Sequence, residues 1–561
     1  MLSNSHPEIG STSMGSGKSG RSWRRDIPWA ILVLAYVVYA GLFIYRTSFV
    51  VEGQRHFTLF DDAMISMRYA KNLAHGDGLV WNPGGERVEG FSNPLWVLIM
   101  AGAHLLPIPP MKISLLIQLG GALLFILALF VIRGIAESFT GKDSPVALCT
   151  AIMTAFYLPL NNWVLQGMEV SLLVLLTCLA VSLGLRLIRT DTFSPWLYLM
   201  LGVGTLVRMD MVVPYLATLT FLAWHSPRHR RRHLGWGLLT LAVFVVGQEA
   251  ARLCYYHQWL PNTYYLKMTG FPLLLRLSRG VSVLFKFIFH LNWILFLLPL
   301  TILLFRRGRE VLFLFWIFLG QIAYSVWVGG DAWEWWGGSN RYISIVMPVF
   351  FITFSLAAEQ IGLWLESASD GWPRRLRSAV VRGWPVFFLL SMVNFNMISD
   401  NSMLKNWLLI DRPLWVDGNR DMVQQALLLK RVTTPQASIA VTWAGAIPYF
   451  ANRTAIDILG KNDLVIAREP AKYMPRVPTL TYFVPGHVKW DYAHSFGTLK
   501  PDVVVQMWWK PHEAEEYLDA DYEKVRFRSF HWFVRKGSPH VRWDVLENLR
   551  WRPKPHQVLW Y

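Results

Sequence analysis

The stretch IPWAILVLAYVVYAGLFIY, Ile27 to Tyr45, is 19 residues long and contains no charged side chain. About 20 apolar residues in a helix cross the roughly 30 Å hydrocarbon core of a bilayer. Four basic residues precede the run, as in a secretory signal peptide: Lys18, Arg21, Arg24 and Arg25. The run is longer than the apolar part of a signal peptide and no small-residue cleavage site follows it, so we predict an uncleaved first membrane helix.

The composition of the whole chain agrees with this prediction. Of the 561 residues, 53% are hydrophobic and only 16% are charged, and 28 are tryptophans. These values indicate a polytopic membrane protein. The net charge of +17 does not indicate nucleic-acid binding, because Lys and Arg collect in short tracts between apolar runs. All cysteines lie within or beside apolar runs, which excludes a disulfide framework and a CxxC metal site: Cys149, Cys178 and Cys254.

Further apolar runs bring the expected number of membrane helices to about eleven. They cover roughly 112–135, 145–160, 168–188, 195–207, 211–225, 234–254, 281–304, 310–328, 341–363 and 384–399. The basic tracts between them are expected on the cytoplasmic side: the N-terminus, 133–142, 186–189, 226–233, 306–309 and 373–382. An arrangement with the N-terminus inside and the C-terminus outside satisfies every tract.

The chain is expected to have three parts. Residues 1–26 form a disordered cytoplasmic N-terminus, and 27–399 form a transmembrane domain. Its first outer loop, 47–111, contains two interfacial helices, one starting at the aspartate pair and one in the short apolar run 94–106. Asn93 and Pro94 suit the N-cap and the first position of the second helix. Residues 400–561 form a small outer α/β domain, because β-prone stretches and Gly turns replace the long apolar runs. The expected strands lie at the start of 437–450, in 454–459 and in 500–507.

Two adjacent carboxylates, Asp61 and Asp62, follow the first helix at its outer end. Aspartate is a favoured N-cap, and carboxylates in a first helical turn complement the helix dipole. That interpretation explains one aspartate better than two. Ionisable groups at a membrane boundary are costly enough to suggest function. We therefore expect Asp61 to act as a general base toward a sugar hydroxyl, with Asp62 as its assistant.

The stretch DDAMISMRYAKNLAHGDGLVWNPGGERVEGFSNPLW (61–96) resembles the first outer loop of the GT-C superfamily of polyprenyl-phosphate-dependent glycosyltransferases. The resemblance is greatest to the terminal arabinofuranosyltransferases of mycobacterial cell-wall assembly. Shorter pieces match the same pattern: QGME (166–169), LVRMD (206–210), LPNTYYLK (260–267), VGGDAWEWWGGSNRY (328–342), IDILGKND (456–463) and GHVKWDY (486–492). The resemblance covers about 55–500.

This resemblance implies a transferase on the outer face of a bacterial inner membrane, with the C-terminal domain outside the cytoplasm. The donor would be a polyprenyl-phosphate sugar, with arabinofuranose as the expected sugar, and the acceptor a glycan or glycoconjugate. Membrane lipids are the other expected partners, and nucleic acid is not one. No cofactor or obligatory metal is expected, with a divalent cation kept as an alternative.

A phosphate leaving group calls for cations. The candidates for binding the donor phosphate are Arg208, Lys267 and Arg341, with Arg68 behind them and His487 as a further ligand. The candidates for binding sugar or acceptor are Glu169, Asp210, Asn262, Tyr264, Asp331, Trp333 and Glu334. Each has an ordinary alternative: basic residues snorkel at helix ends, Tyr and Trp anchor at the interface, and carboxylates bind cations.

Two other functions remain open. A lipid or glycan transporter or flippase predicts charges at the bilayer midplane and pseudo-symmetric halves, and the sequence shows no such repeat. A non-catalytic envelope or motility factor is the second alternative, since related sequences carry flagellar motor-control names.

Overall fold

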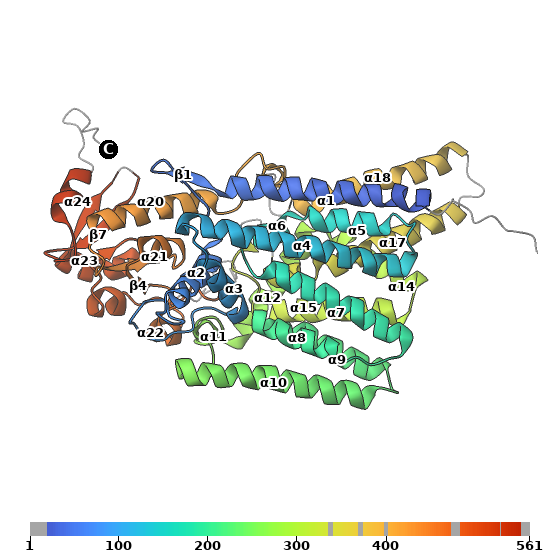
Figure 1. Ribbon diagram of the computed structural model, residues 1–561, viewed down its shortest axis with the longest axis horizontal. Helices are drawn as coiled ribbons and strands as arrows, with labels where there is room; N and C mark the ends of the chain where they lie inside the picture. The colour runs from blue at the N-terminus through green and yellow to red at the C-terminus, as the bar shows by residue number, and fades with distance from the viewer. Residues whose placement is uncertain are drawn as a thin grey trace, which may run out of the picture.

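The computed structural model describes residues 19–334, 340–368, 374–397, 402–472, 483–527 and 529–550. Its two parts lie end to end along the long axis in Figure 1. A bundle of long helices forms one part, and a smaller sheet region formed by the C-terminal third of the chain forms the other. Segments of the first loop lie between them.

The bundle contains most of the helical residues. In chain order its helices are α1 (Ser19–Thr47), α4 (Pro110–Thr140), α5 (Val146–Ala155), α6 (Leu158–Val164), α7 (Val170–Thr190), α8 (Trp196–Val207), α9 (Val212–His225), α10 (Arg230–Tyr256), α12 (Leu273–His290), α13 (Trp293–Leu297), α14 (Ile302–Phe305), α15 (Arg309–Trp327), α17 (Met347–Ala368) and α18 (Arg374–Asn396). The 3-10 turns η1 (Met209–Met211) and η2 (Leu298–Thr301) and the short helices α11 (Asn262–Met268) and α16 (Arg341–Ser344) complete it.

Fewer helices than predicted meet a strict test for crossing a bilayer. Among the described residues, six are long and apolar enough, or seven if one bent pair counts as a single span. The sequence predicted about eleven. The difference comes from short helices such as α8, whose 12 residues measure only about 18 Å at 1.5 Å per residue. These helices pack within the bundle beside the longer ones.

Three predicted runs are broken in the structure. The run at 281–304 is not one helix, because α12 and the segment Trp293–Phe305 meet at a bend of 102°. The run at 145–160 divides into α5 and α6, and the run at 341–363 divides into α16 and α17. Hydropathy alone does not detect such breaks, because the residues on both sides of each break are apolar.

The basic tracts gather at the end of the bundle that lies away from the sheet region, which we call the basic end (Figure 1). Three contacts join the tracts to one another or to α1: Arg133 to Asp26 at 3.0 Å, Arg306 to the carbonyl of Phe139 at 2.9 Å, and Arg309 to the carbonyl of His225 at 3.1 Å. Residue 373 and most of the N-terminal tract lie outside the described residues. A common end is what the positive-inside rule requires, and its cytoplasmic side stays a prediction.

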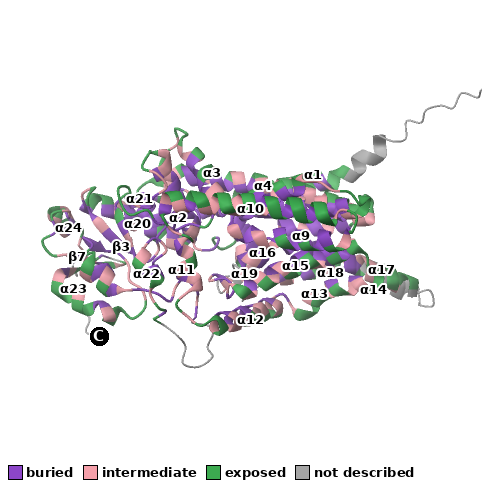
Figure 2. Cartoon of the chain, turned by 90° about the horizontal axis from the view of Figure 1, so that it is seen from below, coloured by how far each residue is buried: buried purple, intermediate pink, exposed green. Residues whose placement is uncertain are grey.

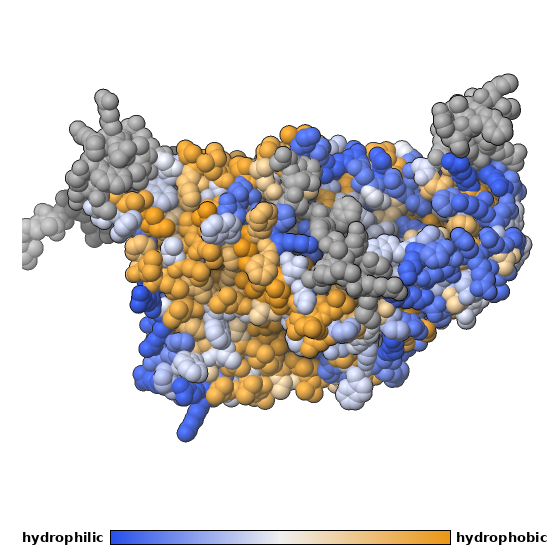
Figure 3. All heavy atoms as spheres, turned by 180° about the vertical axis from the view of Figure 1, so that it is seen from behind, coloured by the Kyte–Doolittle hydropathy of each residue, from blue (hydrophilic) through white to orange (hydrophobic). Residues whose placement is uncertain are grey.

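The side chains of the bundle present an apolar surface. In Figure 3 hydrophobic atoms cover the middle of the molecule, and hydrophilic atoms lie at both ends. Helix α10 contributes strongly to such a surface, since only 11% of its most apolar window is buried inside the protein. The surface and the apolar helices together describe a multi-pass membrane protein.

The first loop forms a hairpin and two helices. Strands β1 (Phe49–Val51) and β2 (Gln54–His56) pair in antiparallel fashion and were not predicted. The predicted helices are present as α2 (Asp61–Ala74) and α3 (Pro94–His104), packed against each other where the bundle meets the sheet region. Their placement at the membrane interface stays a prediction.

The helix caps differ from the expected ones. Phe60 occupies the N-cap of α2, and Asp61 and Asp62 both lie in the first turn. The N-cap explanation for the aspartate pair is therefore wrong, although both carboxylates still face the positive end of the helix dipole. Asn93 precedes α3 as predicted, but its side chain makes no cap and instead donates to Glu169 at 2.9 Å.

The sheet region contains five strands in the order β4-β3-β5-β7-β6. β3 (Ser438–Val441) pairs in parallel with β4 (Thr454–Asp457) and β5 (Val503–Val504), which are the three strands predicted from the sequence. The antiparallel strands β6 (Tyr522–Arg526) and β7 (His531–Arg535) were not predicted. The helical elements around them are α20 (Val416–Val432), α21 (Ala446–Ala451), α22 (Leu464–Arg468), η4 (Ala493–Thr498), η5 (Pro511–Ala514), α23 (Glu515–Asp521) and α24 (Trp543–Leu549). Helix α19 (Ser402–Trp407) instead contacts α18 of the bundle.

Buried hydrogen bonds tie the first loop to the sheet region. The Tyr69 hydroxyl donates to Asn462 at 2.9 Å, and Arg68 donates to the carbonyl of Arg453 at 2.8 Å. Helix α2 is largely buried and packs against α21, beside which it lies in Figure 2. Because these groups lose water on burial, each bond left unmade would be costly. The first loop and the sheet region thus behave as one polar framework.

Two neighbouring glycines of α4 test the tight packing of the bundle. A Cβ on Gly121 would lie 2.7 Å from the carbonyl oxygen of Val164, whereas a Cβ on Gly120 has nothing within 4 Å. We expect Gly121→Ala to lower the free energy of unfolding by about 1–3 kcal/mol through overpacking. Gly120→Ala is the matched control and should be neutral or slightly stabilising. Thermal unfolding in detergent measures both, and equal melting temperatures would contradict the close approach of α4 and α6.

Candidate active site

A cavity of about 480 Å³ lies where the bundle, the first loop and the sheet region meet. Its wall comes from α2, the loop before α3, the α8–α9 connection, the end of α10, α11, α16 and two loops of the sheet region. Most of the predicted site residues line it: Asp62, Glu169, Arg208, Asp210, Tyr264, Lys267, Asp331, Trp333, Arg341 and His487. The fold therefore brings together residues that are far apart in the sequence.

Asp62 is the aspartate of the pair that faces the cavity. Its Oδ2 accepts a hydrogen bond from Arg341 Nη1 at 2.9 Å, and its Oδ1 forms an ion pair with Lys461. Burial raises the pKa of Asp62, but the opposing charges of Lys461, Arg341 and Lys267 outweigh it and hold the pKa well below its usual range. Asp62 is therefore a charged carboxylate with both oxygens occupied by cations.

Asp61 points the other way, toward the sheet region. It is buried, does not line the cavity, and accepts a hydrogen bond from the backbone N–H of Ala446 at 3.3 Å. Burial raises its pKa to about 7, with the charge of Asp62 adding to the rise. The general-base role assigned to Asp61 stays a prediction, but of the two adjacent aspartates only Asp62 lines the cavity.

Lys267 is a half-buried cation at the same corner of the cavity. It has no ion-pair partner among the described residues. The pKa of Lys267 is lowered to about 8, mainly by burial. The positive charges of Arg341 and Lys461 also lower this pKa, and their effect outweighs the opposite effect of Asp62 and Asp331. The stem of Lys267 passes Gly486, where a Cβ would lie 3.2 Å away and where the backbone φ of +89° favours glycine.

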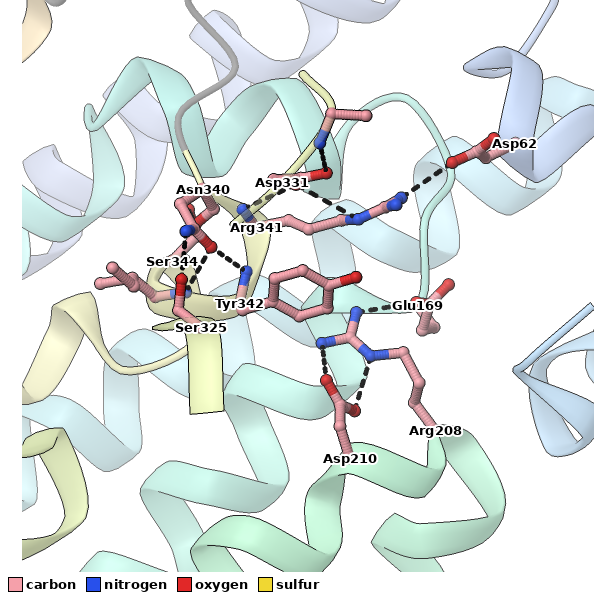
Figure 4. A network of polar contacts seen from close by, with 12 residues as sticks. Asp62, Glu169, Arg208, Asp210, Ser325, Asp331, Asn340, Arg341, Tyr342 and Ser344 are labelled. Atoms are coloured by element: carbon pink, nitrogen blue, oxygen red, sulfur yellow. Dashed lines mark hydrogen bonds and ion pairs between the residues drawn. The ribbon is translucent and has the colours of Figure 1, made fainter. Parts of the chain in front are cut away.

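Arg341 is held in place by a carboxylate and by its helix. Asp331 Oδ2 accepts from the Arg341 backbone N–H at 3.0 Å and lies 3.3 Å from its Nε (Figure 4). Asn340 caps α16 by accepting from the N–H groups of Tyr342 and Ile343. These bonds fix the guanidinium so that one nitrogen points to Asp62.

Arg208 is already saturated by carboxylates. Its Nε and Nη2 both donate to Asp210 at 2.7 Å, and its Nη1 donates to Glu169 at 3.0 Å (Figure 4). The three side chains are buried, and the two carboxylates raise the pKa of Arg208 despite its burial. Two of the three were predicted as sugar ligands and Arg208 as a phosphate ligand. The geometry instead gives a closed ion triad that shapes the floor of the cavity.

Several predicted site residues lie outside the cavity. Arg68, predicted to bind the donor phosphate, donates to the carbonyls of Trp81 and Arg453 and does not line the cavity. Asn262 donates to three carbonyls of the loop after β4. Glu334 is paired with Arg279 at 2.7 Å. These contacts assign the three residues to supporting the wall.

The remaining predicted residues line the cavity with neutral groups. Burial lowers the pKa of His487 to about 3, so its imidazole is uncharged and offers a phosphate no positive charge. Trp333 is buried edge-on against Phe60, with ring centroids 4.6 Å apart, and Tyr264 is partly exposed at the rim. The neighbouring stretch 335–339 lies outside the described residues.

The sequence analysis missed two charged features of the cavity. Lys461 lies within the IDILGKND stretch, yet only its position in the fold brings it to Asp62. Glu89 is paired with Arg252, which also contacts Glu249, and all three line the cavity. The signal available for Lys461 was a charged residue between Gly460 and Asn462, a pattern common in ordinary turns.

No group of three or more His, Cys, Asp or Glu side chains suited to a metal occurs in the described ranges. The cavity has a cation-rich corner, which contains Lys267, Arg341 and Lys461 together with the carboxylates Asp62 and Asp331. Both carboxylates already pair with an Arg or a Lys. The absence of an obligatory metal stays a prediction.

Two family models match parts of the chain. Residues 111–247 match the model of dolichyl-phosphate-mannose-protein mannosyltransferases, and residues 415–545 match a domain of unknown function. The first match includes Glu169, Arg208 and Asp210, and the second includes Lys461 and His487. No curated protein matches the sequence.

Solved structures share the fold. ArnT from Cupriavidus metallidurans in the apo state is 13% identical with a TM-score of 0.52, and the match covers 90% of this chain and 97% of ArnT. An oligosaccharyltransferase from Archaeoglobus fulgidus, tethered with an acceptor peptide, is 11% identical with a TM-score of 0.49, covering 93% of this chain and 75% of that one. The structural similarity to ArnT shows that this chain has a GT-C membrane fold with a small C-terminal sheet region. Together with the mannosyltransferase match, it indicates a glycosyltransferase.

The ion triad around Arg208 yields a prediction about stability. Arg208→Ala leaves Glu169 and Asp210 buried without their cation, and removing one partner of a buried ion pair costs about 3–5 kcal/mol. Arg412, whose pair with Asp417 is exposed, is the control, and Arg412→Ala should cost at most about 1 kcal/mol. Thermal unfolding measures both. A stable Arg208→Ala protein with greatly weakened donor binding would instead make Arg208 a donor ligand.

Proposed function

We propose that the protein transfers a sugar from a polyprenyl-phosphate donor to a hydroxyl of an acceptor glycan. The observation that carries this proposal is Lys267, a half-buried cation that lines the cavity beside Arg341 and Lys461 and has no ion-pair partner among the described residues. Burying a charge without a partner is expensive, and sites that do so are usually completed by a ligand of opposite charge. The phosphate of the donor supplies that charge.

The charges at this corner fit a phosphodiester. Lys267, Arg341 and Lys461 are three cations, and the facing carboxylates are Asp62 and Asp331. The corner therefore carries one excess positive charge, which a monoanionic phosphodiester neutralises. As the sugar leaves, negative charge grows on the phosphate, and fixed cations stabilise this change.

A second, apolar cavity of about 700 Å³ supports a lipid-linked donor. It lies between α9, α12, α15 and α17 and is lined almost wholly by apolar side chains. Helices α9 and α15 line both cavities: Val213 and Tyr324 face the first, and Thr220 and Leu319 face the second. The apolar cavity thus continues from the first cavity along the same two helices toward the basic end. A polyprenyl chain whose phosphate is bound in the first cavity would extend in this direction.

In the proposed reaction Asp62 is the general base. The acceptor hydroxyl oxygen forms a bond to the anomeric carbon, the bond from that carbon to the phosphate oxygen breaks, and its electron pair leaves with the polyprenyl phosphate. The hydroxyl proton passes to Asp62. We assign the base to Asp62 because a base must lie within hydrogen-bond reach of its proton, and Asp61 does not face the cavity.

We propose arabinofuranose as the transferred sugar and an outward-facing site in a bacterial inner membrane as its location. The sugar rests on the resemblance of residues 61–96 to the terminal arabinofuranosyltransferases. The location rests on the basic end, which lies at the far end of the bundle from α2 and α11 (Figure 1), two helices that line the cavity.

The assignment of the base is tested by two neighbouring substitutions. Asp62→Asn should lower transfer from a polyprenyl-phosphoryl sugar by about 10²–10⁴-fold, the usual effect of losing a general base. Asp61→Asn should keep most of the rate, because an amide oxygen can accept the same hydrogen bond from Ala446. Transfer is measured in membranes containing equal amounts of each protein. The reverse pattern would return the role to Asp61.

The pKa of Lys267 predicts a basic limb in the pH profile. Lys267 carries its charge below a pKa of about 8 and loses it as the pH rises through that value, so kcat/KM for the donor should fall above about pH 8. Lys267→Arg stays charged and should move this limb upward by at least one pH unit. A limb unchanged by Lys267→Arg would show that another group titrates there.

A further inference from the structure

Lys461 reaches the cavity from the sheet region, 399 positions after its partner Asp62. It is the only ionic side chain that the described sheet region contributes to the cation-rich corner. Its side chain is 13% exposed, and among the described residues Asp62 is its one ion-pair partner. The family match that covers Lys461 assigns it no role.

The backbone around Lys461 is firmly fixed. Asp457 accepts from the N–H groups of Leu459 and Asn462, and Asn262 donates to the carbonyls of Gly460, Lys461 and Asp463. Gly90 permits this approach, because a Cβ there would lie 2.9 Å from the Lys461 carbonyl. The loop therefore aims the side chain at the cavity, and only its flexible methylene stem is free to swing.

The two cations on Asp62 differ in how firmly they are held. Arg341 is also bound to Asp331 and is fixed by its position at the start of α16. Lys461 forms no second ion pair in the described structure, and Asp61 is the nearby carboxylate whose charge also interacts with it. An incoming anion would therefore displace the lysine from Asp62 more readily than the arginine.

The pairing with Lys461 conflicts with the role of a base. With Arg341 on Oδ2 and Lys461 on Oδ1, Asp62 has no oxygen free of a cation for an acceptor hydroxyl. Lys461 is also the largest of the charges that lower the pKa of Asp62, ahead of Arg341 and Lys267. Asp61 and the neutral His487 are the other titratable groups nearby.

We propose that Lys461 is a phosphate-responsive catalytic residue that pairs with Asp62 before the donor binds and transfers to the donor phosphodiester when it binds. This inference rests on the proposed function. The transfer frees Oδ1 of Asp62 to accept a hydrogen bond from the acceptor hydroxyl, and it removes the main cause of the low pKa. Lys461 then joins Lys267 in stabilising the phosphate as the sugar leaves. Donor binding thereby activates the base, so that the donor binds before the acceptor is activated.

A double-mutant cycle tests the exchange without relying on activity. The probe is polyprenyl monophosphate in detergent, and its Kd is measured for wild type, Asp62→Asn, Lys461→Met and the double variant. Asp62→Asn releases Lys461 in advance and should tighten binding by roughly fivefold, whereas Lys461→Met should weaken it by about tenfold. If Lys461 is the exchanged partner, Asp62→Asn should tighten binding far less when Lys461 is already Met.

The result that overturns the inference is additivity, with Asp62→Asn tightening binding equally in both backgrounds. Lys461→Arg keeps the charge and should bind within a few-fold of wild type. Lys510→Met, at an exposed lysine of the same region, controls for charge alone and should not change the Kd. Thermal unfolding of each variant in detergent separates misfolding from lost binding.

The same measurements distinguish the inference from the proposed function. If wild type binds polyprenyl monophosphate no better than polyprenol, the cavity has no phosphate-binding site and the proposed function is wrong. If it binds the phosphate tightly and the cycle is additive, the glycosyltransferase proposal stands and only the role of Lys461 is removed. A matching kinetic readout is the acid limb of kcat/KM, which Lys461→Met should move upward by about one pH unit because Asp62 loses its main cation.

Discussion

The arrangement of the protein depends on a buried charge balance where three parts of the chain meet. Asp62 from the first loop lies between Arg341 from the bundle and Lys461 from the sheet region. None of these charges could be buried alone without a large desolvation cost, so each part needs the others to be in place. The incomplete neutralisation at Lys267 is what makes this junction a site for an anion as well as a structural contact.

The division between fixed and exchangeable charges follows from how each is held. Arg208 is enclosed by two carboxylates and Arg341 is anchored by Asp331, whereas Lys267 and Lys461 extend on flexible stems. Rigid guanidinium groups keep a defined geometry, and lysine ammonium groups can change partners at little cost in strain. The cavity thus combines a preorganised wall with two movable cations, a combination suited to a leaving group whose charge changes during the reaction.

Much of the fold could be read from local patterns. The apolar run at 27–45, the basic tracts and the β-prone stretches that became β3, β4 and β5 were predicted correctly, because hydropathy and strand periodicity depend on near neighbours in the sequence. The bend between α12 and α13, the broken runs and the β6–β7 hairpin were not, since packing against other elements decides where an apolar segment breaks.

The sequence by itself determined the membrane class, the common end of the basic tracts and the pool of charged residues from which the site is built, because composition and spacing encode these directly. Only the tertiary structure decided which of these charged residues face the cavity. It turned Asp61 toward Ala446 and Asp62 toward the cations, although the two are adjacent. Adjacent residues of an α-helix point about 100° apart, so neighbours can face different surroundings. The fold also brought Lys461 to Asp62, because electrostatic partnership is set by distance in space.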